Sequence, residues 1–257
     1  MKLFKFFAPL LTLFMFFVIW VGVIKIFKVN PFILPDPVSV VESFKTNSIE
    51  LLQAMWVTTL IALSGLLLSF LIGCSVALIM SQSKVIEMSL FPYAILLQSI
   101  PIVAIAPIII LWFGAGFESM VVIAFIISLF PIITNVVVGL TKIEKSYFEL
   151  FSIYKASKIQ ILFFLRIPFA VSMLITGLKI SAGLSVVGAI VGEYFTGLAG
   201  QAFGLAYLIQ STQQHADYPY MYATCFAAAI LGFFIFISVS LLGNWVIKKG
   251  HFNHESN

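Results

Sequence analysis

Polar side chains that could bind a partner or take part in chemistry are concentrated in one long stretch, residues 141–168. Its charged and polar members recur about every third residue, with aromatic and aliphatic side chains between them, which is an amphipathic helical pattern. They are Lys142, Lys145, Glu149, Ser152, Lys155 and Lys158. This arrangement offers ionic and apolar contacts for docking rather than catalysis. Periodicity alone favours a helix that lies on the inner membrane face, held by its aromatic side chains and by anionic lipid.

Other kinds of chemistry find no support in the sequence. There is no Gly-x-x-x-x-Gly-Lys-Ser/Thr loop to hold the phosphates of a nucleotide. His251 and His254 have a helical metal-ligand spacing, but they stand in a short polar tail without a third ligand. Cys74 and Cys225 fall inside apolar runs, where they act as small hydrophobic side chains. We therefore expect neither an enzyme nor a cofactor or metal bound by this chain.

The composition is that of a membrane protein. Hydrophobic residues make up 61% of the 257 residues, charged residues only 9%, and the mean hydropathy is +1.13. Soluble domains contain about 25% charged residues. The net charge of +4 lies in short segments between apolar runs. This placement is typical of topology determinants and excludes a nucleic-acid partner.

Long apolar runs predict an all-α protein with about six transmembrane helices, since a helix needs about 20 apolar residues to cross the hydrocarbon core. The runs are Phe6–Phe27, Trp56–Met80, Phe91–Phe113, Met120–Val138, Pro168–Val191 and Met221–Ile247. The first is longer than the apolar region of a signal peptide and lacks a cleavage site, so we expect it to be retained.

Lysine and arginine placement predicts the orientation in a bacterial cytoplasmic membrane. With the N-terminus inside, the cytoplasmic segments carry most of the basic residues, and the external segments carry few basic and several acidic ones. The cytoplasmic set is Lys2, Lys5, Lys84, Lys142, Lys145, Lys155, Lys158, Arg166, Lys248 and Lys249. Both termini are therefore expected in the cytoplasm.

The chain divides into four parts. Residues 1–30 form the first transmembrane helix, and residues 31–55 an external extended segment followed by an interfacial helix. Residues 56–248 form a core that contains the loop 141–168, and residues 249–257 a cytoplasmic tail. The stretch Gly192–Tyr220 is expected to be the longest external connection.

Small residues recur at every fourth position in two of the predicted spans. In the second span, Gly65, Ser69, Gly73 and Ala77 predict close packing within the chain. In the fifth span, Gly177, Ser181, Ser185 and Ala189 predict either such packing or a subunit or pathway interface.

Polar residues inside the spans are candidates for a translocation pathway, since such groups are costly in lipid and usually face a bundle interior. They are Gln98, Ser99, Thr134, Asn135, Ser181 and Ser185. Each has an equally good alternative as a partner in a hydrogen bond between helices. Lys179 has the alternative of extending to the inner interface. Glu193, at the external end of the fifth span, is a candidate for an external gate or a binding-protein contact.

The loop 141–168 resembles the cytoplasmic "EAA" loop of the permeases of binding-protein-dependent ABC importers. That pattern is Glu-Ala-Ala, three residues, Gly, nine residues and Ile-x-Leu-Pro. Glu149 begins it here, Lys155 takes the place of the glycine, and Ala156-Ser157 follow. Leu165-Arg166-Ile167-Pro168 stands in register with its end. Lysine at the glycine position implies either a less sharp turn or some strain.

Further motifs along residues 30–248 are similar to the same family. They are Leu34-Pro-Asp-Pro, Gln98-Ser-Ile-Pro, Pro107–Gly114, Phe130-Pro131, Gly177-Leu-Lys and Gly192-Glu193. Together they resemble the branch that imports nitrate, taurine, alkanesulfonates, and thiamine or flavin precursors.

The resemblance implies a type I ABC importer permease with a coupling helix between spans 4 and 5. It implies that Glu149, Ser152, Lys155, Ala156, Ser157 and Pro168 contact or position a separate ATPase. The expected partners are two ATPase copies that hold Mg-ATP, a second permease subunit in a homodimer, and an extracytoplasmic binding protein. The main alternative is a secondary transporter or channel that works without an ATPase. It would call for inverted repeats or an ionisable relay.

Overall fold

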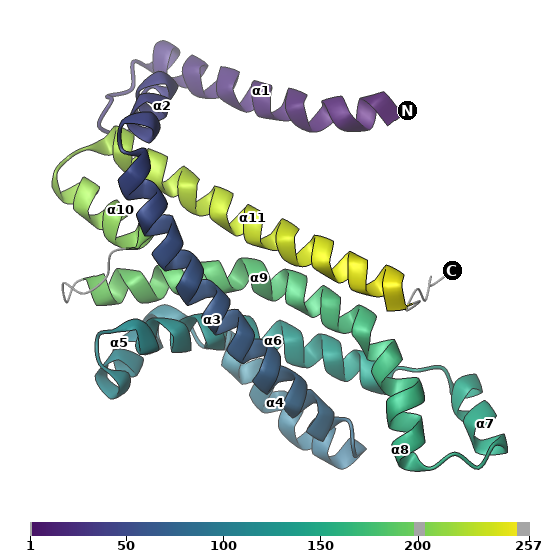
Figure 1. The fold of residues 1–257 in the computed structure, drawn as a ribbon. Coiled ribbons are helices and arrows are strands. Elements are labelled where there is room, and N and C mark those ends of the chain that lie inside the picture. The colour runs from purple at the N-terminus through teal and green to yellow at the C-terminus, as the bar shows by residue number, and fades with distance from the viewer. Residues whose placement is uncertain (1, 198–203, 251–257) are drawn as a thin grey trace.

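The computed structural model describes residues 2–197 and 204–250, and regular structure in these ranges is entirely helical (Figure 1). The helices are α1 (Lys2–Phe27), α2 (Pro37–Thr46), α3 (Ser48–Met80), α4 (Lys84–Ser99), α5 (Ile102–Phe113), α6 (Phe117–Thr141), α7 (Lys145–Ile153), α8 (Lys158–Ile161), the π-helical segment η1 (Leu162–Arg166), α9 (Ile167–Gly197), α10 (Leu205–Gln214) and α11 (Tyr218–Gly250).

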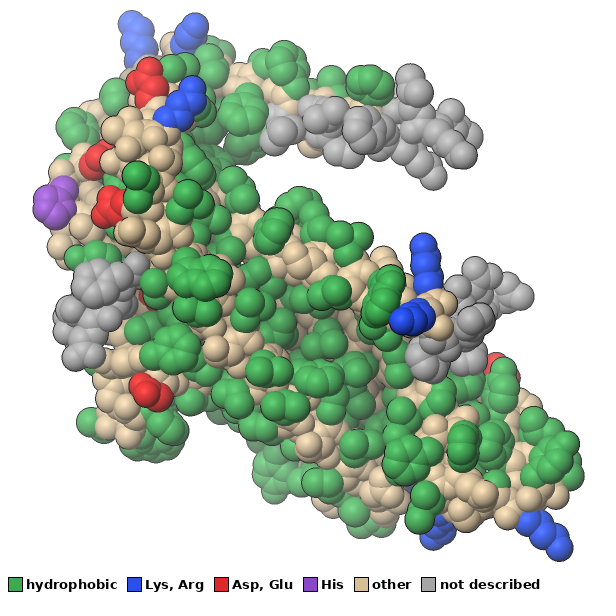
Figure 2. Space-filling model, viewed as in Figure 1, with side chains coloured by type: hydrophobic (Ala, Val, Ile, Leu, Met, Phe, Trp, Pro, Cys, Tyr) green, Lys and Arg blue, Asp and Glu red, His purple; other side chains and the backbone are tan. Residues whose placement is uncertain are grey.

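Four segments in the described ranges are long and apolar enough to cross a membrane: Ser48–Met80, Phe117–Thr141, Lys158–Gly197 and Tyr218–Lys249. A fifth arises if the bent pair α4 and α5 is one span, and α1 adds a shorter apolar helix, Phe14–Phe27. Figure 2 shows hydrophobic side chains over the middle of the visible face, with charged side chains toward its ends.

The expected span Phe91–Phe113 is not one continuous helix, because α4 and α5 meet at an angle of 97°. Ile100 and Pro101 between them are extended, with φ/ψ of −75°/123° and −61°/114°. Proline disfavours the helical conformation of the residue before it and lacks the N–H that would continue the helix. A proline at this position therefore converts one apolar run into two helices.

Two further boundaries differ from the sequence expectation. The interfacial helix of residues 31–55 ends at Thr46, and residues 48–55 belong to the spanning helix α3. Asp36 caps α2 by accepting a hydrogen bond from the Val38 N–H at 3.2 Å. In the expected external connection, α9 continues to Gly197 and a separate helix, α10, begins at Leu205.

Small residues let α3, α6 and α9 pack closely at the centre of the molecule. A Cβ atom at Gly65 would stand 2.6 Å from Ala124 Cβ, and one at Gly177 would stand 2.8 Å from the Pro131 carbonyl oxygen. The small-residue pattern of the second span therefore packs within the chain, as expected. Gly177, on the fifth span, also lies against α6, which supports the first of its two alternatives.

Three buried serines connect these helices through hydrogen bonds. Ser69 Oγ lies 2.7 Å from Ser128 Oγ and donates to the Phe125 carbonyl at 2.8 Å. Ser181 Oγ donates to the Ser128 carbonyl at 2.6 Å. All three side chains are fully buried, so hydroxyl groups in lipid-embedded helices find partners across the α3–α6–α9 interfaces.

Gly188 and Gly183 of α9 provide a direct test of this packing. A Cβ at Gly188 would stand 2.5 Å from Ala124 Cα, whereas Gly183 has nothing within 4 Å. We expect Gly188→Ala to destabilise the protein by about 1–3 kcal/mol, since overpacking forces helices apart. Gly183→Ala should not lower the melting temperature of the detergent-purified protein, and should raise it slightly, since alanine favours a helix by about 0.5–1 kcal/mol over glycine. Equal melting temperatures for the two variants would contradict the packing described.

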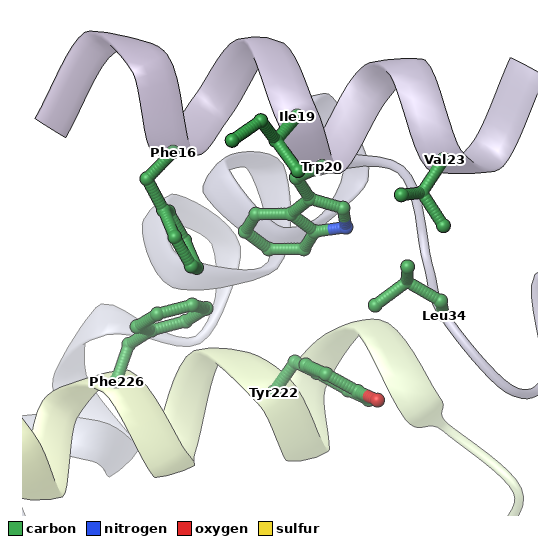
Figure 3. Close-up of a pocket in the computed structure, with 7 residues that line it drawn as sticks. All are labelled: Phe16, Ile19, Trp20, Val23, Leu34, Tyr222 and Phe226. Atoms are coloured by element: carbon green, nitrogen blue, oxygen red, sulfur yellow. The ribbon is translucent and has the colours of Figure 1, made fainter. Parts of the chain in front are cut away.

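Helix α1 stands apart from the rest and is joined to it through aromatic contacts (Figure 1). Trp20 of α1 packs on Phe226 of α11, with ring centroids 5.6 Å apart. Figure 3 shows these two rings in an apolar cavity of about 230 Å³ between α1 and α11, which Leu34 and Tyr222 close on one side. Tyr222 also donates to the Ile33 carbonyl at 2.8 Å, which ties α11 to the external segment.

Candidate functional site

Helix α7 has no buried residue and presents apolar side chains to the surroundings. Ile153 and Tyr154 at its end are 77% and 79% exposed, and Leu150 is half exposed. The amphipathic pattern of residues 141–168 is therefore helical as expected over Lys145–Ile153, and a turn separates this helix from α8 and η1. In Figure 1, α7 and α8 project from the end of the molecule where α1 begins and α11 ends.

The turn after α7 is sharp and places Lys155 in the left-handed conformation, with φ of 51°. The Ala156 N–H donates to the Phe151 carbonyl at 3.0 Å, and the Lys155 N–H donates to the Ser152 carbonyl at 2.9 Å. This is the Schellman motif, in which glycine usually takes the position of Lys155. The sequence left two alternatives for this lysine, a less sharp turn or a strained one. The structure shows the sharp, strained turn.

We expect Lys155→Gly to stabilise the protein by up to about 1 kcal/mol. A left-handed conformation costs about 1–2 kcal/mol for a residue with a Cβ, and the larger entropy of glycine in the unfolded chain offsets part of the gain. The melting temperature of the purified protein measures the effect. Lys155→Ala is the matched control, because it removes the charge and retains the Cβ. If the melting temperature rose equally in both variants, the gain would come from removal of the charge and not from relief of backbone strain.

Ser157 starts the helix that follows the turn. Its Oγ accepts a hydrogen bond from the Gln160 N–H at 3.3 Å, and Gln160 Oε1 accepts one from the Ser157 N–H at 2.8 Å. This reciprocal pair is a capping box, which fixes the direction of α8 relative to α7. Between the two helices lies an open hollow of about 370 Å³. Its lining is Leu150, Phe151, Tyr154, Ala156, Gln160 and Phe164.

Contacts from aromatic rings and Arg166 attach this loop to the spans. The ring of Tyr147 packs edge-on against Phe169 of α9, with centroids 5.2 Å apart. The Arg166 guanidinium lies 5.6 Å from the centre of the Phe148 ring, and its Nη1 donates to the Ser81 carbonyl at 3.0 Å. Helix α7 is therefore in contact with α9 and, through Arg166, with the α3–α4 turn.

Pro168 lies just beyond the π-helical segment η1. Proline has no N–H for the ordinary helical hydrogen bond, and a π-bulge in the preceding turn is one way to accommodate this loss. The Ile167 N–H donates to the Leu162 carbonyl, five residues earlier. Pro168 therefore shapes the connection between the loop and α9. It does not form part of the hollow.

The pathway candidates are not brought together at one place. Gln98 and Ser99 are exposed at the end of α4, where Ser99 Oγ donates to the Ile95 carbonyl at 2.9 Å. Thr134 and Asn135 are half-buried on α6, and Asn135 Nδ2 donates to the Pro131 carbonyl at 2.8 Å.

The remaining intramembrane candidates lie on α9. Ser181 and Ser185 are fully buried, and Ser185 Oγ donates to the Ala182 carbonyl at 3.0 Å. Ser181 makes the hydrogen bond between helices that was its alternative, to the Ser128 carbonyl of α6, whereas the hydrogen bond of Ser185 lies within α9. Lys179 donates to Asn244 Oδ1 of α11 at 3.0 Å.

Glu193 is fully buried and binds the first turn of α10. Its Oε2 accepts a hydrogen bond from the Ala206 N–H at 2.9 Å, and its Oε1 accepts one from the Thr58 hydroxyl at 2.6 Å. Thr58 Oγ1 in turn accepts from the Leu205 N–H at 3.0 Å. A carboxylate and a hydroxyl thus satisfy N–H groups at the positive end of α10. We call Thr58, Glu193 and this helix end the α10 clamp.

Sequence reasoning missed three residues that organise these sites. Ser128 connects α3, α6 and α9, Thr58 completes the α10 clamp, and Arg166 attaches the loop to Ser81. Ser128 and Thr58 are buried polar residues inside apolar runs, the same signal that selected Thr134. Nothing in the sequence identifies their partners, which are 135 residues away for Thr58 and Glu193.

No cluster of three or more metal-binding side chains exists among the described residues. His251 and His254 lie outside that part of the chain. The fold is that of a polytopic helical membrane protein with an exposed amphipathic loop at one end.

The comparisons with known proteins assign the family. The model of the binding-protein-dependent transport system inner membrane component matches residues 65–249, and the chain belongs to this family. It is 32% identical over 241 residues to the formylaminopyrimidine transport permease protein of Halalkalibacterium halodurans, covering 92% of this chain and 93% of the relative. It is 32% identical over 239 residues to the riboflavin transport system permease protein of Chloroflexus aurantiacus, covering 92% and 88%.

Solved structures support the same fold. The inward-facing methionine ABC transporter MetNI contains a chain that aligns with a TM-score of 0.61 at 18% identity, covering 78% of this chain and 95% of that chain. The chain is therefore the membrane-embedded permease subunit of an ABC importer, as the motif resemblance predicted. The family is a component of binding-protein-dependent transport systems.

Proposed function

We propose that α7, the Lys155 turn and α8 form the coupling element that docks on a separate ATPase subunit. The observation that carries this proposal is an exposed apolar helix that is nevertheless firmly attached to the spans. A short amphipathic helix of this kind fits a hydrophobic groove in a partner. The contact surface comprises Glu149, Ser152, Lys155, Ala156 and Ser157. Pro168 positions the loop from behind.

The proposed topology has six spans: α1, α3, the bent pair α4–α5, α6, α9 and α11. Both termini and the coupling element lie in the cytoplasm of a bacterial cell, and α2 and α10 lie outside. Lysines at the end of α11 and in the coupling element support this orientation. Two copies of the chain, two ATPases that hold Mg-ATP and an external binding protein make up the working importer.

Gln98 and Ser99, exposed at the break between α4 and α5, are the best-supported pathway residues, since this break interrupts a span. Thr134 and Asn135 are half-buried on α6, and Asn135 borders Gly177 of α9. Ser181 and Ser185 act through helix packing. Glu193 acts on external contacts through the position of α10.

The substrate class that we propose is a small nitrogen heterocycle, a pyrimidine or flavin precursor. The relatives named for formylaminopyrimidine and riboflavin transport are 32% identical to this chain, whereas those named for aliphatic sulfonate and taurine transport are 26% and 23% identical. In this proposal the binding protein provides the selectivity for the solute, and the permease only has to let that solute pass.

Uptake by cells that express the complete transporter tests both parts of the proposal. Radiolabelled aminopyrimidine should accumulate, excess riboflavin or unlabelled pyrimidine should compete, and excess taurine should not. If taurine competed and the riboflavin and pyrimidine compounds did not, the substrate would belong to the sulfonate class. ATP depletion with the ion gradients maintained should stop uptake. Continued uptake under that condition would instead favour a secondary transporter.

A further inference from the structure

A polar pocket of about 410 Å³ lies at the end of the molecule that carries α7, outside the coupling element. The α3–α4 turn, the end of α6 and Arg166 form its walls. Its lining is Ser81, Gln82, Ser83, Lys84, Glu87, Thr141, Lys142 and Arg166. Three cationic side chains and one carboxylate therefore face a common space, and the charge of the lining is positive.

The positive charge of this pocket is not neutralised within the described part of the chain. None of Lys84, Lys142 and Arg166 forms an ion pair there. Arg166 is held in place by its bond to the Ser81 carbonyl and by the Phe148 ring, and its buried Nε has no hydrogen-bond partner in the described residues. A fixed guanidinium and two lysines that line the same pocket match the oxygen atoms of a phosphate group.

The surroundings of the pocket add two further features. The pocket lies at the N-terminus of α4, a helix of 16 residues, whose dipole favours an anion. Beside it, Val85 and Met88 of the same helix are 72% and 69% exposed. A ligand with an anionic head and an apolar tail would therefore cover both the polar pocket and the adjacent apolar surface.

We infer that this pocket binds the phosphate group of an anionic phospholipid, with the acyl chains lying along α4. Basic pockets between transmembrane helices at the cytoplasmic interface bind such head groups. Lys84 and Lys142 contact the phosphate, Arg166 fixes the third wall, and Glu87 weakens binding by like-charge repulsion. The lipid stabilises the α3–α4 turn against Arg166, the residue that attaches the coupling element.

The test is the affinity of the full-length chain, purified in mild detergent with its co-purifying subunits, for short-chain phosphatidylglycerol. Lys84→Gln with Lys142→Gln should weaken binding about thirtyfold, since one basic residue near an anionic lipid surface contributes about a fivefold change. Lys248→Gln with Lys249→Gln, a matched change at the end of α11, should leave the affinity unchanged. Glu87→Gln should strengthen binding about fivefold.

The Glu87 variant keeps the test valid if the double variant fails to fold, because damage to the structure does not increase affinity. Phosphatidylcholine and glycerol phosphate serve as the other ligands, and both should bind at least tenfold more weakly than phosphatidylglycerol. If glycerol phosphate bound as tightly as phosphatidylglycerol, the pocket would be a site for a free anion, and the proposal of a lipid site would be overturned. The proposal would also be overturned if the pocket double variant and the control double variant bound phosphatidylglycerol with the same affinity. Binding by the isolated chain but not by its complex would show that a partner covers the pocket.

Discussion

Ala156→Glu should abolish stable association with the ATPase subunit and, with it, uptake. Ala156 lines the hollow between α7 and α8, at a position where the partner would bury it. An unpaired charge buried in an interface costs about 3 kcal/mol or more, which corresponds to an affinity loss of about a hundredfold. Co-purification of the ATPase with the tagged permease and uptake in whole cells measure the two effects.

Gln213→Glu is the control for this variant. It introduces the same charge at an exposed position of α10, far along the chain from the coupling element. We expect normal amounts of both permease and ATPase in its purified complex. If Ala156→Glu also co-purified with a full complement of ATPase and supported normal uptake, the hollow would not be the docking site.

Glu193→Ala should release α10 from α3 and α9. The substitution removes the acceptor of the Ala206 N–H and of the Thr58 hydroxyl, both of which are buried. A buried donor left without a partner costs about 1–3 kcal/mol. Hydrogen exchange of the amides in residues 205–214 should therefore become about ten- to a hundredfold faster. If α10 positions the external surface, uptake falls while ATPase co-purification is retained.

Two further variants isolate the role of the clamp. Gly204→Ala should accelerate the same amides, because a Cβ at Gly204 would overlap the Glu193 carboxylate. Glu50→Gln alters a different hydrogen bond, in which the Tyr220 hydroxyl donates to Glu50 at 3.0 Å. It should leave exchange in α10 unchanged. Unchanged exchange in Glu193→Ala would show that other contacts hold α10.

The sequence was sufficient for the class, the family and the position of most helices. Apolar runs of about 20 residues locate spans because a lipid environment leaves few alternatives to a helix. The loop motif ending at Pro168 identified the family, which the comparisons confirm. The motif also located the Lys155 turn, although its departure from glycine left two possible geometries, and the φ of 51° decides between them.

Long-range partners and backbone bends could not be obtained in the same way. Hydropathy is insensitive to the 97° bend after α4, because the residues on both sides of Pro101 belong to one apolar run, Phe91–Phe113. Glu193 is recognisable as a carboxylate at a span end, but its burial depends on Thr58 and on a helix that the sequence pattern did not indicate. The same limit applied to Ser181, whose partner Ser128 lies on another span.

The most direct measurement replaces Tyr154, at the exposed end of α7, with a photo-crosslinking amino acid and irradiates intact membranes. The proposed function predicts an adduct with an ATPase that bears a phosphate-binding loop. Trp112, 74% exposed on α5, is the control position and should give no such adduct. If Tyr154 and Trp112 both yielded only lipid adducts, α7 would be a helix lying on the membrane, and the coupling role would be contradicted.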